Sequence, residues 1–203
     1  ELALSCDYRI GTRKTQFRFP ETSIGIFPGL GGTQRPARIA GIPVARWAVL
    51  AGNFMDAKTA TDLGLVTNLV DVSDVDSMIA TLDSQGKPAN KYPSKPQNPE
   101  SKIAQFAESF YSDENLDSIL NGNCPDGFDS EDKLVSRQMK SLSRTAPIAL
   151  RMASELIDAA GETNLAEGLS QELGKLEAIF STDDALEGLS ALIEGRKPTY
   201  QNS

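Results

Sequence analysis

Two glutamates and a glycine-rich turn are the part of this sequence whose residue types could carry out acid–base chemistry. Glu21 lies in the segment FRFPETSIGIFPGLGGTQR, residues 17–35, directly after a proline and shortly before the turn PGLGGT, and Glu1 stands upstream of it. Two carboxyls beside the free N–H groups of a turn can act as acid and base next to a carbonyl. Because neighbouring carboxyls repel each other's charge, their pKa values separate and their roles can divide.

The absence of histidine from the chain excludes more chemistry than any residue adds. Ser-His-Asp and Cys-His nucleophiles, His-rich zinc sites and facial-triad iron sites all need an imidazole. Cys6 and Cys124 have neither metal-ligand nor redox spacing, which favours a reduced protein. The turn is not a phosphate loop, because no GKS or GKT follows it. We therefore expect no metal site, and we expect carboxylates as the proton carriers.

Composition indicates a soluble globular protein of 203 residues, of which 39% are hydrophobic. The formal net charge of −8 argues against nucleic acid or an anionic membrane as the main partner, since both would repel the chain. No apolar stretch reaches the roughly 18 residues of a membrane span, and no secretory leader is visible. These features predict a cytoplasmic protein.

The first third of the chain alternates short strands with helices, which predicts an α/β fold. Strand-like runs occur around 8–10, 17–19 and 65–71, with one helical turn expected over 21–25. A helix is expected to start in GTQRPARIAG. A second helix should open near Pro43 and stop at Gly52, and a third should be capped by Asp56 and end at Gly64. Residues 1–83 are assigned to this region.

Residues 84–144 read as a linker and helical insertion, and residues 145–203 as a helical region. The stretch 84–100 is rich in proline, lysine and asparagine, so we expect it to be irregular or mobile. Helices follow near 103–111, 114–120 and 131–142. Pro147 opens another helix, and Asp183 is expected to cap the last one. Between them a helix is expected with this apolar stripe: Leu165, Leu169, Leu173, Leu176 and Phe180.

Four ordered segments resemble the enoyl-CoA hydratase/isomerase (crotonase) family. They are ELALSCDYRI, FRFPETSIGIFPGLGGTQRPARIAG, LAGNFMDAKTATDLGLVTNLV and, at the end, DALEGLSALIEGRKPTY. The resemblance implies a crotonase-like spiral of ββα units, present here in part. It also implies a helical C-terminal region that helps to form trimers and covers the active site.

The resemblance implies roles for seven residues. Glu1 would help activate the water that attacks C3 of a trans-2-enoyl-CoA, Glu21 would act as acid toward C2, and Gly29 would touch this water. The neighbouring Pro28 and Leu30 are assigned to substrate binding. Arg196 and Lys197 either approach the coenzyme A phosphates or complement the dipole of the last helix. The coenzyme A thioester is the substrate, and no separate cofactor is expected.

The family's oxyanion hole uses backbone N–H groups that precede the position of Glu1. We therefore expect the chain to be a fragment that lacks the N-terminal half, whether that half is missing or joined to another protein. Loss of one oxyanion donor typically costs roughly 10²–10³ in rate, so the fragment alone should be nearly inactive.

Three functions stay open at this point. The resemblance favours a lyase, an enoyl-CoA hydratase of fatty-acid β-oxidation, forming a homotrimer or hexamer through apolar surface left on residues 147–195. The length of 84–144 resembles relatives that hydrolyse 3-hydroxyisobutyryl-CoA. Those hydrolases, however, commonly lack a glutamate at the Glu1 position and carry aspartate at the Gly29 position, while isomerases generally keep only the carboxylate matching Glu21. The third alternative is a non-catalytic part of a multifunctional fatty-acid oxidation protein.

Overall fold

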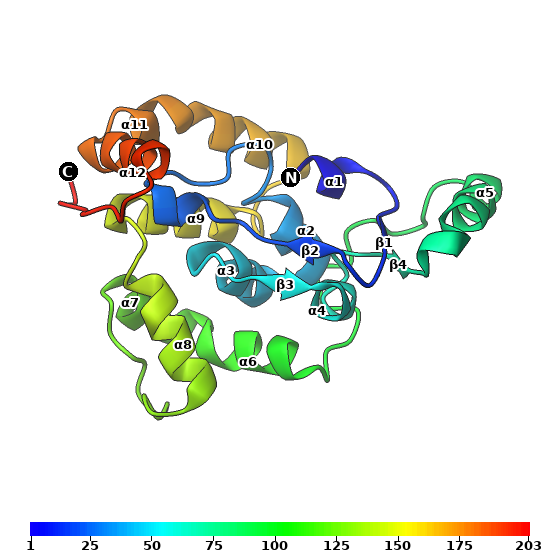
Figure 1. Ribbon diagram of the computed structural model, residues 1–203, viewed down its shortest axis with the longest axis horizontal. Helices are drawn as coiled ribbons and strands as arrows, with labels where there is room; N and C mark the ends of the chain where they lie inside the picture. Colours follow the sequence, from blue (N-terminus) through cyan, green and yellow to red (C-terminus); the bar gives the residue numbers. More distant parts are fainter.

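The computed structural model describes all 203 residues of the chain and is rich in helix (Figure 1). Its strands are β1 (Ile10–Gly11), β2 (Gln16–Phe17), β3 (Met55–Asp56) and β4 (Asn68–Leu69). Its α-helices are α1 (Leu2–Ser5), α2 (Arg35–Ala40), α3 (Ile42–Leu50), α4 (Ala57–Asp62), α5 (Val75–Gln85), α6 (Lys102–Phe110), α7 (Asp113–Leu120), α8 (Lys133–Leu142), α9 (Pro147–Ala159), α10 (Leu165–Gly174), α11 (Leu176–Phe180) and α12 (Asp183–Glu194). Two 3₁₀ helices, η1 (Glu21–Ile24) and η2 (Val72–Asp74), complete it. None of these helices is long and apolar enough to cross a membrane.

The strands form two small pairs instead of one broad sheet. β1 pairs in parallel with β4, with Ile10 opposite Asn68, and β2 pairs antiparallel with β3, with Phe17 opposite Met55. The helical turn η1 follows β2 as expected. The predicted alternation of short strands with helices is therefore present in this part of the chain.

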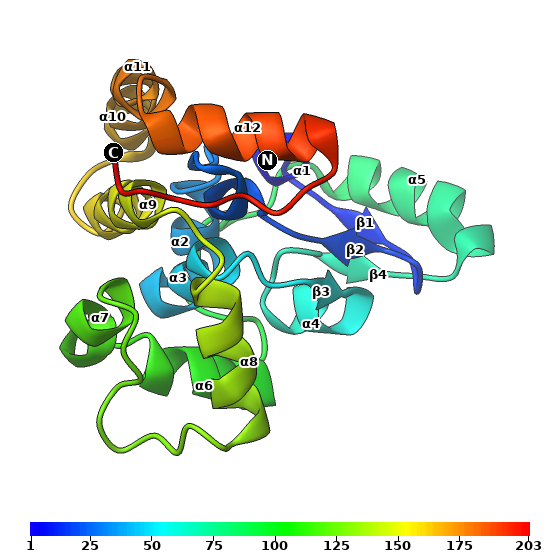
Figure 2. The ribbon, with the colours of Figure 1, turned by 60° about the vertical axis from the view of Figure 1, so that its left-hand side comes forward.

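Helix α3 forms the centre of the hydrophobic core, with α2, α6 and α9 packed around it (Figure 2). All its residues from 44 to 50 are buried. Pro43 lies in its first turn, where no intrahelical N–H is needed, and Gly52 follows it with a φ of +57°. The Asp56 carboxylate accepts from the Thr59 N–H over 2.7 Å and caps α4. These predicted helix boundaries are confirmed.

The insertion packs into the same core as the preceding residues. Phe110 and Tyr111 on α6, Ile119 on α7, and Val135 and Leu142 on α8 belong to the buried cluster that also contains α3. The connecting stretch from 86 to 101 has no helix or strand, so its predicted irregularity is confirmed. It is nonetheless attached to the core, because the N–H groups of residues 94 and 95 donate to carbonyls of α2.

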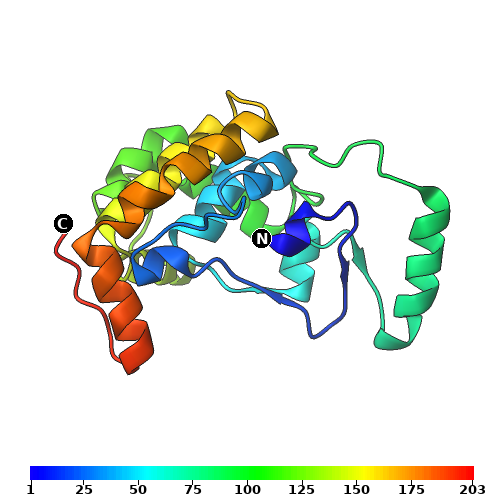
Figure 3. The same ribbon diagram turned by 90° about the horizontal axis from the view of Figure 1, so that it is seen from above.

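Helix α5 is not among the expected elements. It projects away from the rest of the molecule, and Leu82 is its only buried residue (Figure 3). Its sequence nevertheless has apolar residues at helical spacing, namely Val75, Met78, Ile79 and Leu82. The expected boundary after residue 83 falls inside this helix, which ends at Gln85.

The C-terminal helices differ from expectation in two details. The predicted single helix over 165–180 is broken at Lys175 into α10 and α11. Its buried residues are Gly168, Glu172 and Ile179, whereas Leu173 and Phe180 of the predicted stripe are 66% and 52% exposed. The predicted cap of α12 by Asp183 is also wrong.

The residue that caps α12 is Thr182, whose hydroxyl accepts from the Ala185 N–H. Asp183 instead lies in the first turn of α12, where its negative charge complements the helix dipole.

Candidate active site

The glycine-rich turn between η1 and α2 is held by carboxylates. The N–H groups of Leu30 and Gly32 donate to the same oxygen of Glu1, Oε1, over 2.7 and 2.8 Å. These two bonds orient the Glu1 carboxylate against the turn and do not use its second oxygen. A Cβ atom at Gly32 would lie 2.6 Å from Glu1 Oε1 and 2.5 Å from Pro28 Cβ, so only glycine permits this approach.

Glu21 begins η1, directly after Pro20, and its side chain is partly buried. Its oxygen Oε2 is buried without a hydrogen-bond partner in the protein. Burial raises the pKa of the Glu21 carboxyl, and the negative charge of Glu1 raises this pKa further. The two carboxyls therefore interact across the site, and Glu21 retains its proton to higher pH than an ordinary glutamate. A water molecule bridging the two carboxyls stays a prediction.

Helix α12 fixes the position of η1 through a close backbone contact. A Cβ atom at Gly25, which ends η1 with a φ of +85°, would lie 2.4 Å from the Asp184 carbonyl oxygen. A Cβ atom at Gly188 would lie 2.2 Å from the Ile24 carbonyl oxygen. Glycine is thus needed on both sides, and the end of the chain determines where the Glu21 turn lies.

The other turn residues assigned from the sequence lie in contrasting environments. Gly29 packs against α11, where a Cβ atom would lie 2.6 Å from Leu176 Cδ2. Leu30 is 75% exposed and Pro28 is buried beneath the turn. Leu30 can therefore contact a molecule bound on this surface, while the Pro28 side chain shapes the turn from inside.

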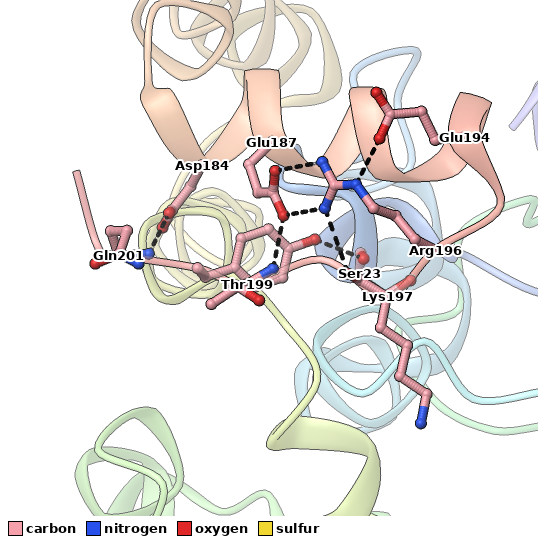
Figure 4. Close-up of polar contacts among 9 residues, drawn as sticks. Ser23, Asp184, Glu187, Glu194, Arg196, Lys197, Thr199 and Gln201 are labelled. Carbon is pink, nitrogen blue, oxygen red and sulfur yellow. Dashed lines mark hydrogen bonds and ion pairs between the residues drawn. The ribbon is translucent and has the colours of Figure 1, made fainter.

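Arg196 and Lys197 lie at the end of α12, after Gly195 (Figure 4). The Arg196 guanidinium makes two parallel bonds to Glu187, of 2.6 and 2.7 Å, and a third of 2.6 Å to Glu194. Lys197 makes no ion pair and extends away from this cluster (Figure 4). Of the two predicted phosphate contacts, Lys197 alone keeps a positive charge that no carboxylate offsets.

Glu172 is a residue of this site that the sequence pattern misses. It lies on α10, and its carboxylate accepts from the N–H groups of Gly31 and Thr33 over 2.5 and 3.1 Å, and from the Thr33 hydroxyl. It stands 139 residues from Thr33 in the chain. No spacing in the sequence indicates this contact, because it depends on how α10 packs against the turn.

The larger cavities lie away from these carboxyls. One of about 740 Å³ opens between the start of α3 and the ends of α6 and α9, and Arg38, Glu108 and Asp113 line it. Neither Glu1 nor Glu21 borders it. The case for the site therefore rests on the carboxyls and the turn, and not on a cavity.

The family model for enoyl-CoA hydratase/isomerase matches residues 2–203. Among curated proteins, the chain is 28% identical over 200 residues to a probable mitochondrial enoyl-CoA hydratase 2 of Arabidopsis thaliana, covering 98% of the chain and 48% of that protein. It is 29% identical over 201 residues to the 2,3-dehydroadipyl-CoA hydratase of Escherichia coli K12, covering 99% and 57%. The chain thus spans about half the length of the curated relatives it matches.

Solved structures agree on the fold. A carnitinyl-CoA dehydratase from Mycobacterium thermoresistibile superposes with a TM-score of 0.74 at 21% identity, and an enoyl-CoA hydratase from Rhodobacter sphaeroides with 0.73 at 23%. Each match covers 98% of this chain and 58% of the other. The predicted partial crotonase fold followed by a helical region is confirmed. The chain belongs to the enoyl-CoA hydratase/isomerase family.

Proposed function

We propose that this chain supplies the acid–base half of an enoyl-CoA hydratase site that acts in fatty-acid β-oxidation. The observation that carries the proposal is the unlike pair of carboxyls beside one turn. Glu1 is oriented by two N–H donors, and Glu21 has a raised pKa and a buried oxygen without a partner. An oriented carboxylate and a carboxyl that feels its charge are the base and acid that addition of water to a conjugated thioester needs.

In the proposed reaction Glu1 accepts a proton from water as the water oxygen bonds to C3 of a trans-2-enoyl-CoA. The electron pair of the C2–C3 double bond moves toward the thioester carbonyl, giving an enolate. Glu21 then delivers its proton to C2, and the two carboxyls return to their starting states by exchange with solvent. The Gly29 N–H contacts the attacking water, as the family resemblance implies.

The enolate oxygen needs N–H donors that stabilise its negative charge. By family resemblance the two oxyanion donors correspond to positions outside residues 1–203. Each such donor is worth roughly 10²–10³ in rate. Residues 1–203 alone are therefore expected to hydrate slowly, at a rate that stoichiometric protein and long incubation can detect.

Two features weigh against the alternative reactions. Gly29 stands where related 3-hydroxyisobutyryl-CoA hydrolases carry aspartate, and an added side chain there meets Leu176. Glu1 is present and is bonded to the turn, whereas related isomerases generally keep only the carboxylate matching Glu21. Both features favour addition of water over hydrolysis or isomerisation.

The test is hydration of trans-2-butenoyl-CoA by residues 1–203, followed as loss of the enoyl absorbance and by mass spectrometry of the product. Glu1→Gln and Glu21→Gln are each expected to lower the rate at least about 10²-fold. Glu162→Gln is the matched control, because that side chain is exposed and makes no hydrogen bond. Rates equal to the parent in both site variants would contradict the hydratase. No product from the parent chain would favour a non-catalytic role.

Self-association through the C-terminal helices is part of the same proposal. Large apolar side chains on these helices are exposed, namely Leu173, Phe180, Leu186, Leu192 and Ile193. Exposed apolar area of this kind favours association, with a homotrimer as the first expectation. Light scattering over a concentration series should show a mass above that of one chain. A monodisperse monomer at high concentration would contradict it.

A further inference from the structure

The buried carboxyl of Glu172 is the feature outside the acid–base pair that most requires an explanation. Its side chain is 1% exposed, although glutamate is rarely buried unless it is fully bonded. Both of its oxygens are used: Oε1 accepts from Gly31 N–H, and Oε2 from the N–H and hydroxyl of Thr33. All three donors belong to the turn that contains Gly29.

The turn is held from two sides by alternate N–H groups. Those of Leu30 and Gly32 donate to Glu1, and those of Gly31 and Thr33 donate to Glu172. The two carboxylates therefore bind the same stretch of backbone, and each accepts from the N–H groups that do not donate to the other. Loss of the Glu172 carboxylate would free the N–H groups of Gly31 and Thr33, in the same turn whose Leu30 and Gly32 N–H groups orient Glu1.

The Thr33 hydroxyl has a defined direction within this arrangement. Gln34 donates from Nε2 to Thr33 Oγ1 over 3.2 Å and to the Leu156 carbonyl over 2.6 Å. Because Thr33 Oγ1 accepts from Gln34, its own proton is directed to Glu172. The chain of bonds joins α9, the turn and α10.

Helices α10 and α11 also contact the turn through apolar atoms. A Cβ atom at Gly31 would lie 3.1 Å from Leu169 Cδ2, and one at Gly29 would lie 2.6 Å from Leu176 Cδ2. Leu169, Glu172 and Leu176 thus lie against the turn within two turns of helix. The C-terminal helical region is in direct contact with the backbone that faces the acid–base pair.

We propose that Glu172 is a positioning residue, which holds residues 29–33 so that the Gly29 N–H and the Glu1 carboxylate face the same water. Its effect on catalysis rests on the proposed hydratase function. Its effect on the geometry of the turn does not, and it can be measured without substrate.

The test compares Glu172→Gln with the parent chain, with Glu177→Gln as matched control because Glu177 is exposed on the adjoining α11 and its carboxylate makes no hydrogen bond. Amide hydrogen exchange by NMR is the first readout. Exchange at Gly31 and Thr33 should become at least about tenfold faster in Glu172→Gln, since charge-assisted bonds are lost. Unchanged exchange at both amides would overturn the proposal.

Hydration of trans-2-butenoyl-CoA is the second readout. Glu172→Gln should lower kcat about 10–100-fold with KM changed less than about threefold, because misplacement of the turn affects the chemical step more than substrate binding. If Glu172→Gln does not fold, Thr33→Val, which removes one of the three donors, should show the same split more weakly, and Thr33→Ser should retain the parent rate. A kcat within twofold of the parent in Glu172→Gln or, failing that, Thr33→Val would overturn the proposal. Faster exchange in Glu172→Gln, combined with no hydration by the parent chain, would overturn the proposed function and leave the role of Glu172 in the turn intact.

Discussion

Glutamates occur in two contrasting places in this molecule, around the glycine-rich turn and at the end of α12. At the turn, burial is the first cause that raises the pKa of both Glu21 and Glu172, and no lysine or arginine pairs with either carboxyl. At the end of α12, the half-buried Glu187 carboxylate accepts two bonds from Arg196, which lower the pKa of Glu187 to about 2. Burial thus raises the pKa of the same side chain in one region, and an ion pair lowers it in the other.

The difference concerns solvent as much as charge. Arg196 and Glu187 keep contact with water, so their attraction is screened and contributes little to folding. The Glu172 carboxylate bonds to backbone N–H groups out of water, where each bond is harder to replace. Substitutions at the turn and in the core should therefore have large effects, and substitutions at the end of α12 small ones.

Glu21→Gln should produce the largest effect. Loss of a general acid is expected to lower hydration roughly 10²–10⁴-fold. The same variant should be more stable than the parent at pH 7. The folded-state pKa of Glu21 is raised, so its contribution to stability is complete below the unfolded value of 4.5 and is lost as pH rises through the folded value.

Urea unfolding of this variant and the parent, measured at several pH values, checks the second part. The stability difference should be present at pH 7, shrink as pH falls toward 4.5, and be absent at lower pH. A variant less stable than the parent at pH 7 would contradict the burial argument for Glu21.

Gln138→Leu tests whether the insertion depends on buried polar contacts. The side-chain amides of Gln138 and Asn53 donate one hydrogen bond to each other, of 2.8 and 3.1 Å, and the Gln138 oxygen also accepts from the Tyr111 hydroxyl over 2.9 Å. Leucine would leave buried polar groups of Asn53 and Tyr111 without this hydrogen-bond partner, which lowers the free energy of unfolding by about 1–3 kcal/mol for each group. Urea unfolding should show this loss, while Ser136→Ala, at an exposed position on the same helix, should change stability by less than about 0.5 kcal/mol. A Gln138→Leu variant as stable as the control would contradict it.

Gly29→Ala should have a smaller effect that a second substitution relieves. The new Cβ atom would lie 2.6 Å from Leu176 Cδ2, and crowding of this kind costs about 1–3 kcal/mol. Leu176→Ala removes the contacted atom, so the double variant should recover part of the loss. A double-mutant cycle by thermal unfolding measures this coupling. Additive effects of the two substitutions would exclude the contact.

Glu187→Gln should have the smallest effect at neutral pH, because the Arg196 pair is exposed. The pKa of Glu187 is lowered in the parent chain. The contribution of this carboxylate to stability is therefore present above the ordinary value of 4.5 and is lost as pH falls toward 2. Melting curves at pH 7 and pH 3, at low and high salt, check this. A loss at pH 7 as large as that of Gln138→Leu would contradict the contrast between the two regions.

Local sequence signals predicted the elements whose causes are local. Pro43 opens α3 and Asp56 caps α4, since a proline without an N–H and a carboxylate near free N–H groups act within one helical turn. Helix α5 carries local signals too, since Val75, Met78, Ile79 and Leu82 lie at helical spacing and Gly86 follows its end, although no helix is predicted there. The stripe expected on α10 follows apolar residues. The buried residues of α10 are instead Gly168, which packs against Gln34 and Arg38, and Glu172, which bonds to the turn.

The site divides in the same way. The family resemblance predicts that Glu1, Glu21 and Gly29 belong to one site. The hydrogen bonds of Glu1 to residues 30 and 32 are consistent with this prediction. Glu172 reaches the turn from 139 residues away, and only the packing of α10 determines that. The pairing of Arg196 with Glu187 likewise depends on how the chain turns back after Gly195 (Figure 4).

The transfer of a proton from Glu21 to C2 is the central claim, and isotope exchange tests it most directly. 3-Hydroxybutyryl-CoA would be incubated with residues 1–203 in deuterated water, and deuterium at C2 measured by mass spectrometry. The parent chain should introduce deuterium at C2, and Glu21→Gln should do so at least about 10²-fold more slowly, with Glu162→Gln unchanged. Exchange at C2 by Glu21→Gln as fast as by the parent would contradict the assignment of Glu21 as the acid.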